Sequence, residues 1–250
     1  MSIDPFEHTK APHFHFDQCE PIELQLSHPP HRQKPCWIHS RAMGLPKEFI
    51  DRMLLKEMYT CHFCGFTSRK YQEVVVRNGQ EWHLDNVKAA CVFCAQGFTI
   101  DWVANMRSGV LLHLPKISQN ELNHLLKVIY VFRISQGDHA NKARDILDLL
   151  MKSREQAKKL LSSDDPYELA KRLRIPLSEY SSKKLKETLS EIRLLPLDRR
   201  IIKEADLEFN QFPQILAYWR SKDGPLRGGV NRFSHEQLDV YIDRLKDKKK

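Results

Sequence analysis

The sequence has no run of about 18 consecutive apolar residues, the length that a membrane-spanning helix needs. It also lacks an N-terminal segment that is basic and then apolar, as a secretory signal would be. From these absences we expect that the chain does not span a membrane and is not secreted. We therefore expect a cytoplasmic protein, in which thiols stay reduced and bind metal rather than pair as disulfides.

Acidic residues are in the minority. The chain has 32 Asp and Glu against 40 Lys and Arg, a net charge of +8, and it ends in three lysines at 248–250. This excess predicts an acidic partner, which can be nucleic acid, anionic lipid or an acidic protein surface. A solvated basic surface is the alternative, because the cations are spread along the chain rather than gathered in one block.

Cysteine is scarce as well, but four of the six cysteines form two CxxC pairs. Cys61 and Cys64 make the first pair, and Cys91 and Cys94 make the second. Four thiolates at this spacing close a tetrahedron around one Zn²⁺ in zinc ribbons and treble clefs. Two disulfides or four buried thiols are the alternatives. We predict one structural zinc held by these four residues, and ordinary thiols at the other two cysteines.

The residues between the two pairs predict a β-hairpin. Residues 71–77 are rich in β-formers, and Asn78 and Gly79 supply the two positive-φ positions of a type I′ turn. Residues 80–84 are expected to form the return strand. A helix is expected over 91–106, which would place the second cysteine pair near amide groups that favour thiolates.

The remaining segments show strand and helix patterns. Their periodicity and capping residues predict the following elements. They are strands at 20–26 and 110–115, a helix over 46–58 with Met53 and Met58 on its apolar stripe, a helix from the capping box at Ser118 to Gly137, a helix over 139–161, and then short helices with N-caps at Asp165 and Ser234.

The order of CxxC, hairpin, CxxC and helix resembles the HNH endonuclease family, whose ββα core is often framed by a structural zinc. The resemblance implies a general-base His on the first strand and a metal-binding His after the last cysteine. Here the chain has Val74–Val76 and then Ala95 and Gln96 at those positions. Asn86 matches the family's turn Asn and His83 is a possible base, but these two alone cannot hold a catalytic metal. We expect no enzymatic activity.

The sequence motifs around the cysteines are more specific than this order of elements. They resemble the IcmJ (DotN) family of type IVB secretion systems and related conjugation machines. The resemblance covers residues 20–200. The motifs are YTCHFCGF at 59–66, YQEV at 71–74, ACVFCAQ at 90–96, LHLP at 112–115, ELN at 121–123 and IRLLP at 192–196.

This resemblance implies a cytoplasmic zinc-containing adaptor, peripheral at the inner membrane through a coupling complex. It implies binding to the C-terminal region of the DotL coupling ATPase, contact with other coupling-complex subunits, and a role in recruiting substrates. Candidate contacts are Phe63, Phe66 and Tyr71, taken as exposed aromatics, with burial against helix 46–58 as the alternative. A nucleic-acid-binding zinc module or a divergent HNH endonuclease is the alternative function.

The fold class that follows is α+β, with an HNH-like (treble-clef, ββα) zinc core wrapped and extended by helices. At 250 residues with 41% apolar content, the chain can form one core domain plus an appended region. We expect three parts. They are a disordered His-rich segment at 1–18, a zinc-binding domain with packed helices at 19–161, and a helical region with a basic tail at 162–250.

Overall fold

The computed structural model describes residues 20–27, 37–77, 83–175 and 179–227, with Asp243 and Leu245. Several predictions lie outside these residues. They are the disordered segment 1–18, the thiols Cys19 and Cys36, the Asn78-Gly79 turn, the N-cap at Ser234 and the basic tail.

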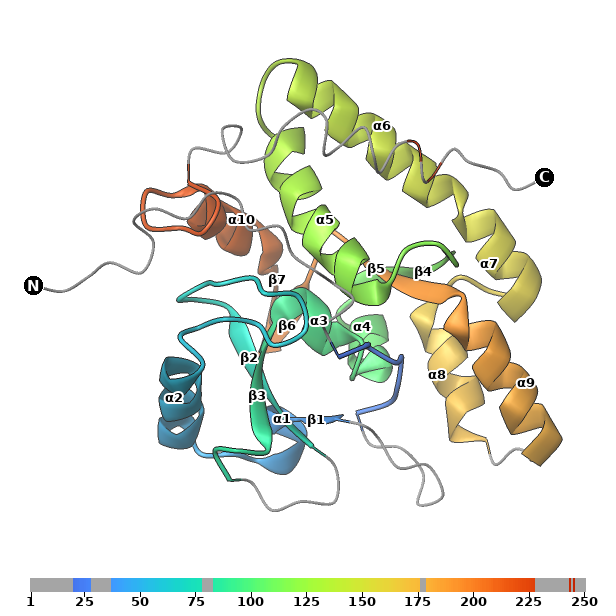
Figure 1. The fold of residues 1–250 in the computed structure, drawn as a ribbon, viewed down its shortest axis with the longest axis horizontal. Coiled ribbons are helices and arrows are strands. Elements are labelled where there is room, and N and C mark those ends of the chain that lie inside the picture. The colour runs from blue at the N-terminus through green and yellow to red at the C-terminus, as the bar shows by residue number, and fades with distance from the viewer. Residues whose placement is uncertain are drawn as a thin grey trace, which may run out of the picture.

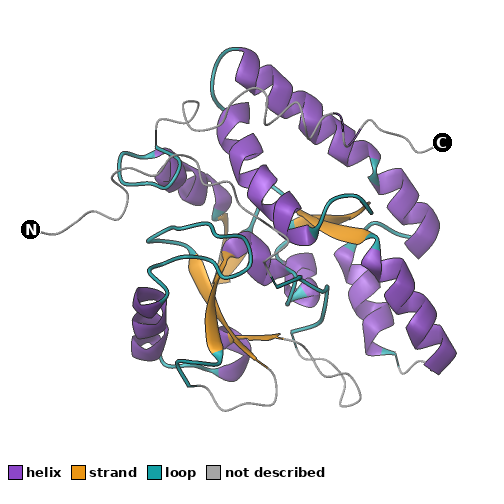
Figure 2. Cartoon of the chain, viewed as in Figure 1, coloured by secondary structure: helices purple, strands orange, loops and turns teal. Residues whose placement is uncertain are grey.

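The described chain combines helices with small antiparallel sheets, so the predicted α+β class is right (Figures 1 and 2). The helices are α1 (Ser40–Met43), α2 (Lys47–Lys56), α3 (Val92–Gln96), α4 (Ile100–Asn105), α5 (Gln119–Arg133), α6 (Asp138–Lys152), α7 (Arg154–Leu161), α8 (Pro166–Arg174), α9 (Glu179–Ser190) and α10 (Phe212–Arg220). The strands are β1 (Trp37–His39), β2 (Gln72–Arg77), β3 (Val87–Cys91), β4 (Gly109–His113), β5 (Ile192–Pro196), β6 (Ile201–Glu204) and β7 (Leu207–Asn210).

The first sheet has the order β1-β2-β3, and β2 is buried on both of its faces. Val74 and Val76 join a cluster with Met53 of α2, whereas Val75 joins the main core, which also contains the cysteine pairs. A strand covered on both faces favours such a continuous apolar run. The strand predicted at 71–77 is therefore confirmed.

The return strand is β3, so the prediction that residues 80–84 return is wrong. Gln72 pairs with Cys91 and Val76 pairs with Val87, while Leu84 lies in a turn before β3. The reason is composition. Residues 87–91 are mostly apolar, as suits a strand in a sheet that is buried on both faces, and residues 80–82 lie outside the part of the chain that the structure describes.

Two predicted helices are each divided in two. The helix expected over 91–106 breaks at Gly97–Thr99 into α3 and α4, and the one expected over 139–161 breaks at Ser153 into α6 and α7. At the second break, the His113 backbone N–H of β4 donates to the Ser153 carbonyl at 3.3 Å. A strand thus contacts a carbonyl at the helix junction. Helix α5 also ends at Arg133, before Gly137, which instead precedes α6 with a φ of 88°.

Residues 20–27 form no strand, which corrects the prediction for 20–26. The alternation is real, because Ile22 and Leu26 are buried. The backbone of Gln25, however, bonds to Gly97 at 2.9 Å and to Ile100 at 3.0 Å, on both sides of the α3–α4 junction. The segment therefore pairs with a loop between helices instead of a sheet edge.

The helix predicted over 46–58 is α2, with Met53 buried at its centre. Met58 lies beyond its end with a φ of 49° and is 71% exposed, so its predicted place on the apolar stripe is wrong. The capping box at Ser118 and the N-cap at Asp165 are confirmed.

The strand predicted at 110–115 is β4, and it pairs with β5 far along the chain. Sequence reasoning expected only short helices after residue 161 and so missed β5, β6 and β7. Figure 1 shows the first sheet beside α2 at one end of the molecule and α8 and α9 at the other. The predicted domain boundaries stay a prediction. The β4–β5 ladder crosses the boundary predicted between residues 161 and 162.

In the part of the chain that the structure describes, no helix combines the length and apolar content that crossing a bilayer requires.

Candidate metal centre

The four predicted cysteine ligands come together in one buried cluster. All four Sγ atoms lie within 4.8 Å of one another, and those of Cys64 and Cys91 are 3.7 Å apart. A tetrahedron with metal–sulfur bonds of about 2.3 Å has edges of about 3.8 Å, whereas a disulfide needs about 2.05 Å. The cysteines are free thiols. The spacing therefore fits a four-coordinate metal ion and excludes the disulfide alternative.

Local backbone bonds place both pairs. In the first knuckle, the Cys61 N–H donates to Phe66 O at 3.0 Å and the Gly65 N–H donates to Cys61 O at 2.8 Å, with Gly65 at a φ of 67°. In the second, Cys91 ends β3 and caps α3, and its Sγ accepts the Cys94 N–H at 3.4 Å. Thus a turn and a strand-to-helix junction present the sulfur atoms to one point.

Helix α5 adds a row of polar side chains that contact the sulfur atoms. The Asn123 amide donates to Cys94 Sγ at 3.4 Å, and the Lys127 ammonium donates to Cys64 Sγ at 3.4 Å. Gln119 in turn donates to Asn123 Oδ1 at 2.9 Å. Residues four apart share one helix face, so the row follows from the helix itself. Sequence reasoning missed it, although polar residues at this spacing among apolar neighbours were a readable signal.

The electrostatics of the cluster favour a thiolate at Cys64 and oppose one at Cys94, where burial and the neighbouring sulfur atoms raise the pKa. Burial raises the pKa of the Cys64 thiol, but hydrogen bonds from the other three cysteines and the charge of Lys127 outweigh it and hold that pKa well below its ordinary value. At Cys61, burial raises the pKa. Burial lowers the pKa of Lys127, yet the surrounding sulfur charges outweigh it, so Lys127 stays charged. A buried cation beside sulfur atoms suits a tetrathiolate metal centre, whose net charge is negative.

The expectation that Phe63 and Phe66 are exposed is wrong, since both are buried. The Phe63 ring lies 5.5 Å from Trp37, and the Phe66 ring lies 5.4 Å from Trp219 of α10. Their neighbours are thus the core around the knuckle, because the turn points these side chains inward. Tyr71 is half-buried and keeps accessible surface.

The positions matched to the HNH enzymes do not form a second cluster. Val74–Val76, Ala95 and Gln96 are buried, and Asn86 binds the His83 backbone N–H at 3.1 Å. Asn86 immediately precedes β3, at the opposite end of that strand from Cys91. Across the described ranges, the cysteine cluster is the single group of three or more His, Cys, Asp or Glu placed to hold a metal ion.

Comparison with known proteins gives a relative. No family model matches the chain. The chain is 34% identical over 104 residues to the type 4 apparatus protein DotN of Legionella pneumophila, subspecies pneumophila, strain Philadelphia 1. The match takes in 40% of this chain and 49% of DotN, so it spans about half the length of that curated relative. The match supports the resemblance found in the sequence, because the matched relative is itself a DotN (IcmJ) protein.

Proposed function

We propose that this chain is a non-catalytic, zinc-containing adaptor subunit of a type IVB secretion apparatus or a related conjugation machine. It binds the C-terminal region of a DotL-like coupling ATPase, contacts other subunits of the coupling complex and helps recruit substrates. The observation that carries the proposal is the 34% identity to the type 4 apparatus protein DotN. The buried cysteine cluster supports the zinc part of it.

The zinc has a structural role in this proposal. Cys61, Cys64, Cys91 and Cys94 hold one ion, which ties the knuckle to the end of β3 and the start of α3. All four ligand positions are taken by thiolates, as in structural rather than catalytic zinc sites. Sites of this kind contribute about 10 kcal/mol or more to the stability of the fold.

The order of elements supports an HNH-like core, because the hairpin β2–β3 follows the first cysteine pair and leads into α3, which contains Cys94. The chemistry of that family is missing from it. A nuclease needs a base and metal ligands between hairpin and helix, whereas Val74–Val76 and Ala95 are apolar. We therefore assign the core a scaffolding role.

A zinc-fixed core suits an adaptor because its surface is formed before the partner arrives, so the entropic cost of ordering falls on the partner segment. Tyr71 remains a candidate contact. Phe63 and Phe66 act through the packing of the knuckle, because both are buried. Binding to the ATPase places the chain in the cytoplasm, peripheral at the inner membrane.

A pull-down with the purified C-terminal region of the coupling ATPase tests this function. We expect the full chain to retain that region at low salt and at high salt, as an apolar contact would, and a metal-depleted chain to lose it. Duplex DNA is the second bait, because the net charge of +8 favours a nucleic-acid-binding module. Salt-sensitive binding of DNA without any binding of the ATPase would replace the adaptor with that module.

A further inference from the structure

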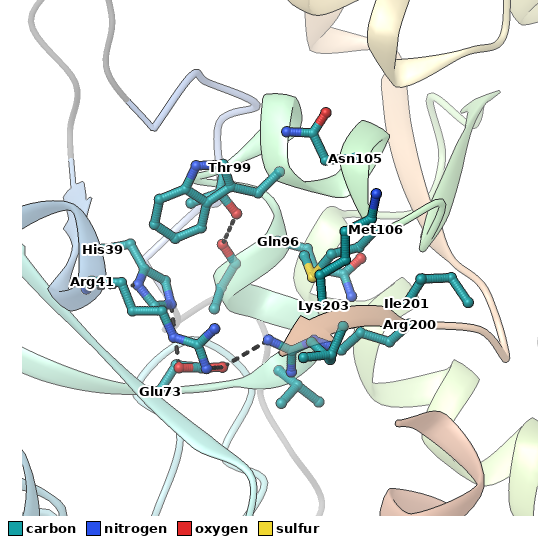
Figure 3. A pocket seen from close by; sticks show the side chains of 14 residues that line it. His39, Arg41, Glu73, Gln96, Thr99, Asn105, Met106, Arg200, Ile201 and Lys203 are labelled. Atoms are coloured by element: carbon teal, nitrogen blue, oxygen red, sulfur yellow. Dashed lines mark hydrogen bonds and ion pairs between the residues drawn. The ribbon is translucent and has the colours of Figure 1, made fainter. Parts of the chain in front are cut away.

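A pocket of about 580 Å³, whose lining contains none of the four cysteines, is formed by residues of β1, α1, β2, α3, α4 and β6 (Figure 3). Its volume falls in the range of about 300–1,000 Å³ that small-molecule sites occupy. It lies where the first sheet meets the β6–β7 hairpin, which sequence reasoning missed. Neither the proposed zinc site nor the proposed ATPase contact uses it.

One carboxylate organises the polar wall of the pocket. Glu73 accepts from Arg200 Nη2 at 3.0 Å and lies 3.4 Å from His39 Nε2 and 3.6 Å from Arg41 Nη2. His39 Nδ1 accepts the Arg41 backbone N–H at 3.1 Å, so the ring proton is on Nε2, facing Glu73. Burial raises the pKa of Glu73, but His39, Arg200 and Arg41 outweigh it and hold that pKa well below its usual range. Glu73 therefore stays ionised and fixes the cations around it.

Two buried polar atoms in this wall have no hydrogen-bond partner. They are the Gln96 Oε1 acceptor and the Arg200 Nε donor. Both residues are more than nine-tenths buried, at 4% and 7% exposure. Figure 3 draws Gln96 beside Met106, and Arg200 reaching toward Glu73. A buried polar group without a partner costs free energy, so a ligand that offers one donor and one acceptor would recover it.

The charge of the pocket is positive and its remaining wall is apolar. The described lining residues include three cations, Arg41, Arg200 and Lys203, and one carboxylate, Glu73. Lys203 pairs with Glu208 outside the pocket. Val92, Trp102, Met106, Ile201 and Ile202 supply apolar surface. An anion with an apolar group fits this combination, whereas a metal cation would be repelled by the guanidinium groups.

We propose that this pocket binds a small organic anion of the amido-carboxylate class, in which a carboxylate stands next to an N–H group and an apolar substituent. Side chains of this wall must shift to admit the ligand, because both unpartnered atoms have less than 1 Å² of accessible surface. The carboxylate then accepts the Nε–H of Arg200 and is attracted by the charges of Arg41 and Lys203. The N–H donates to Gln96 Oε1, and the apolar substituent packs against Met106. A bare phosphate would satisfy the cations but would leave the Gln96 acceptor and the apolar wall without partners.

Titration of the full chain with N-acetyl-leucine at millimolar concentrations tests the proposal. Calorimetry or ligand-observed NMR measures the binding. N-acetyl-leucinamide is the matched probe, because it differs by the loss of the charged carboxylate. We expect the acid to bind at least about tenfold more tightly than the amide, as a charge-assisted hydrogen bond requires. No binding of the acid, equal binding of both probes, or phosphate binding at least as tightly would overturn the proposal.

Variants locate the binding. Gln96→Leu removes the acceptor at nearly constant size and breaks no bond of Oε1, so the fold should persist while affinity for N-acetyl-leucine falls at least about fivefold. Lys203→Gln should weaken binding by about two- to fivefold, because this side chain is exposed. Lys159→Gln on α7, outside the pocket, is the matched control and should bind as the unaltered chain does. Unchanged binding in both pocket variants would contradict the assignment.

Discussion

Lys127 is a lysine with 1% exposure, and its ammonium contacts a cysteine sulfur. Its ammonium group lies over the rings of Phe66 and Phe93, whose centroids are 4.9 and 5.5 Å from Nζ. Burying a cation this deeply is costly unless a negative charge pairs with it. Lys127 is therefore best explained as the counter-charge of a tetrathiolate metal centre. This role makes it the most informative single position near the cysteines.

Lys127→Met keeps the length of the side chain and removes the charge. We expect zinc affinity to fall by about tenfold, in line with losses of outer contacts to metal ligands. Competition with a chromophoric chelator measures it, and Lys159→Met on the exposed face of α7 is the control. Equal zinc affinity in Lys127→Met and the unaltered chain would remove the counter-charge role.

Glu73 gives a prediction about pH. The pKa of Glu73 is held below its ordinary value of 4.5, so its contribution to stability is fully present above about pH 4.5 and is lost as pH falls below it. Glu73→Gln should lower the free energy of unfolding by about 3 kcal/mol at pH 7, because it leaves the Arg200 charge buried without a partner. Urea titrations from pH 7 to 3 check this. A difference between the two proteins that stays constant down to pH 3 would contradict it.

At the scale of elements, the short segment 20–27 is attached by specific contacts. Asn120 of α5 binds the Ile22 N–H, the Glu20 carbonyl and the Phe63 carbonyl, which joins the segment to the first knuckle. A Cβ at Gly97 would lie 2.4 Å from Ile22 Cγ2. The close approach of Ile22 therefore explains the glycine. Backbone conformation does not, since Gly97 lies in the right-handed helical region that any residue can adopt.

Gly97→Ala tests this attachment. We expect a loss of about 1–3 kcal/mol in the free energy of unfolding, because the methyl group overlaps Ile22. In the double variant Gly97→Ala with Ile22→Ala, the added methyl finds room, so the two losses should fall short of additivity by at least about 0.5 kcal/mol. Denaturant unfolding of the four proteins measures the coupling, and strictly additive losses would show that the two residues do not meet.

The elements that sequence could predict are those with a local signal. The capping box at Ser118 and the Pro after Asp165 mark helix starts through neighbouring residues alone, and the cysteine spacing predicts the cysteine cluster. The elements that it missed depend on distant partners. β3 was misplaced because the sheet is buried on both faces, and β5 is stabilised by pairing with β4. The Glu73 pocket was missed for the same reason, since Glu73 and Arg200 are far apart in sequence.

For the whole molecule, the cysteine cluster lies in the main hydrophobic core together with α5, β5 and α10. The first knuckle contacts α10 through Phe66 and Trp219, and it contacts α5 through Lys127. Loss of the metal should therefore loosen elements far along the chain as well as the hairpin. This coupling is what makes the zinc-fixed surface of the proposed adaptor depend on the four cysteines.

Elemental analysis of the purified, folded chain tests this central claim most directly, with Cys64→Ser measured beside it. The account predicts about one zinc per unaltered chain, and for Cys64→Ser a loss of zinc together with a large drop in unfolding temperature. A soluble, cooperatively folded chain that contains no zinc, and whose stability Cys64→Ser leaves unchanged, would contradict it.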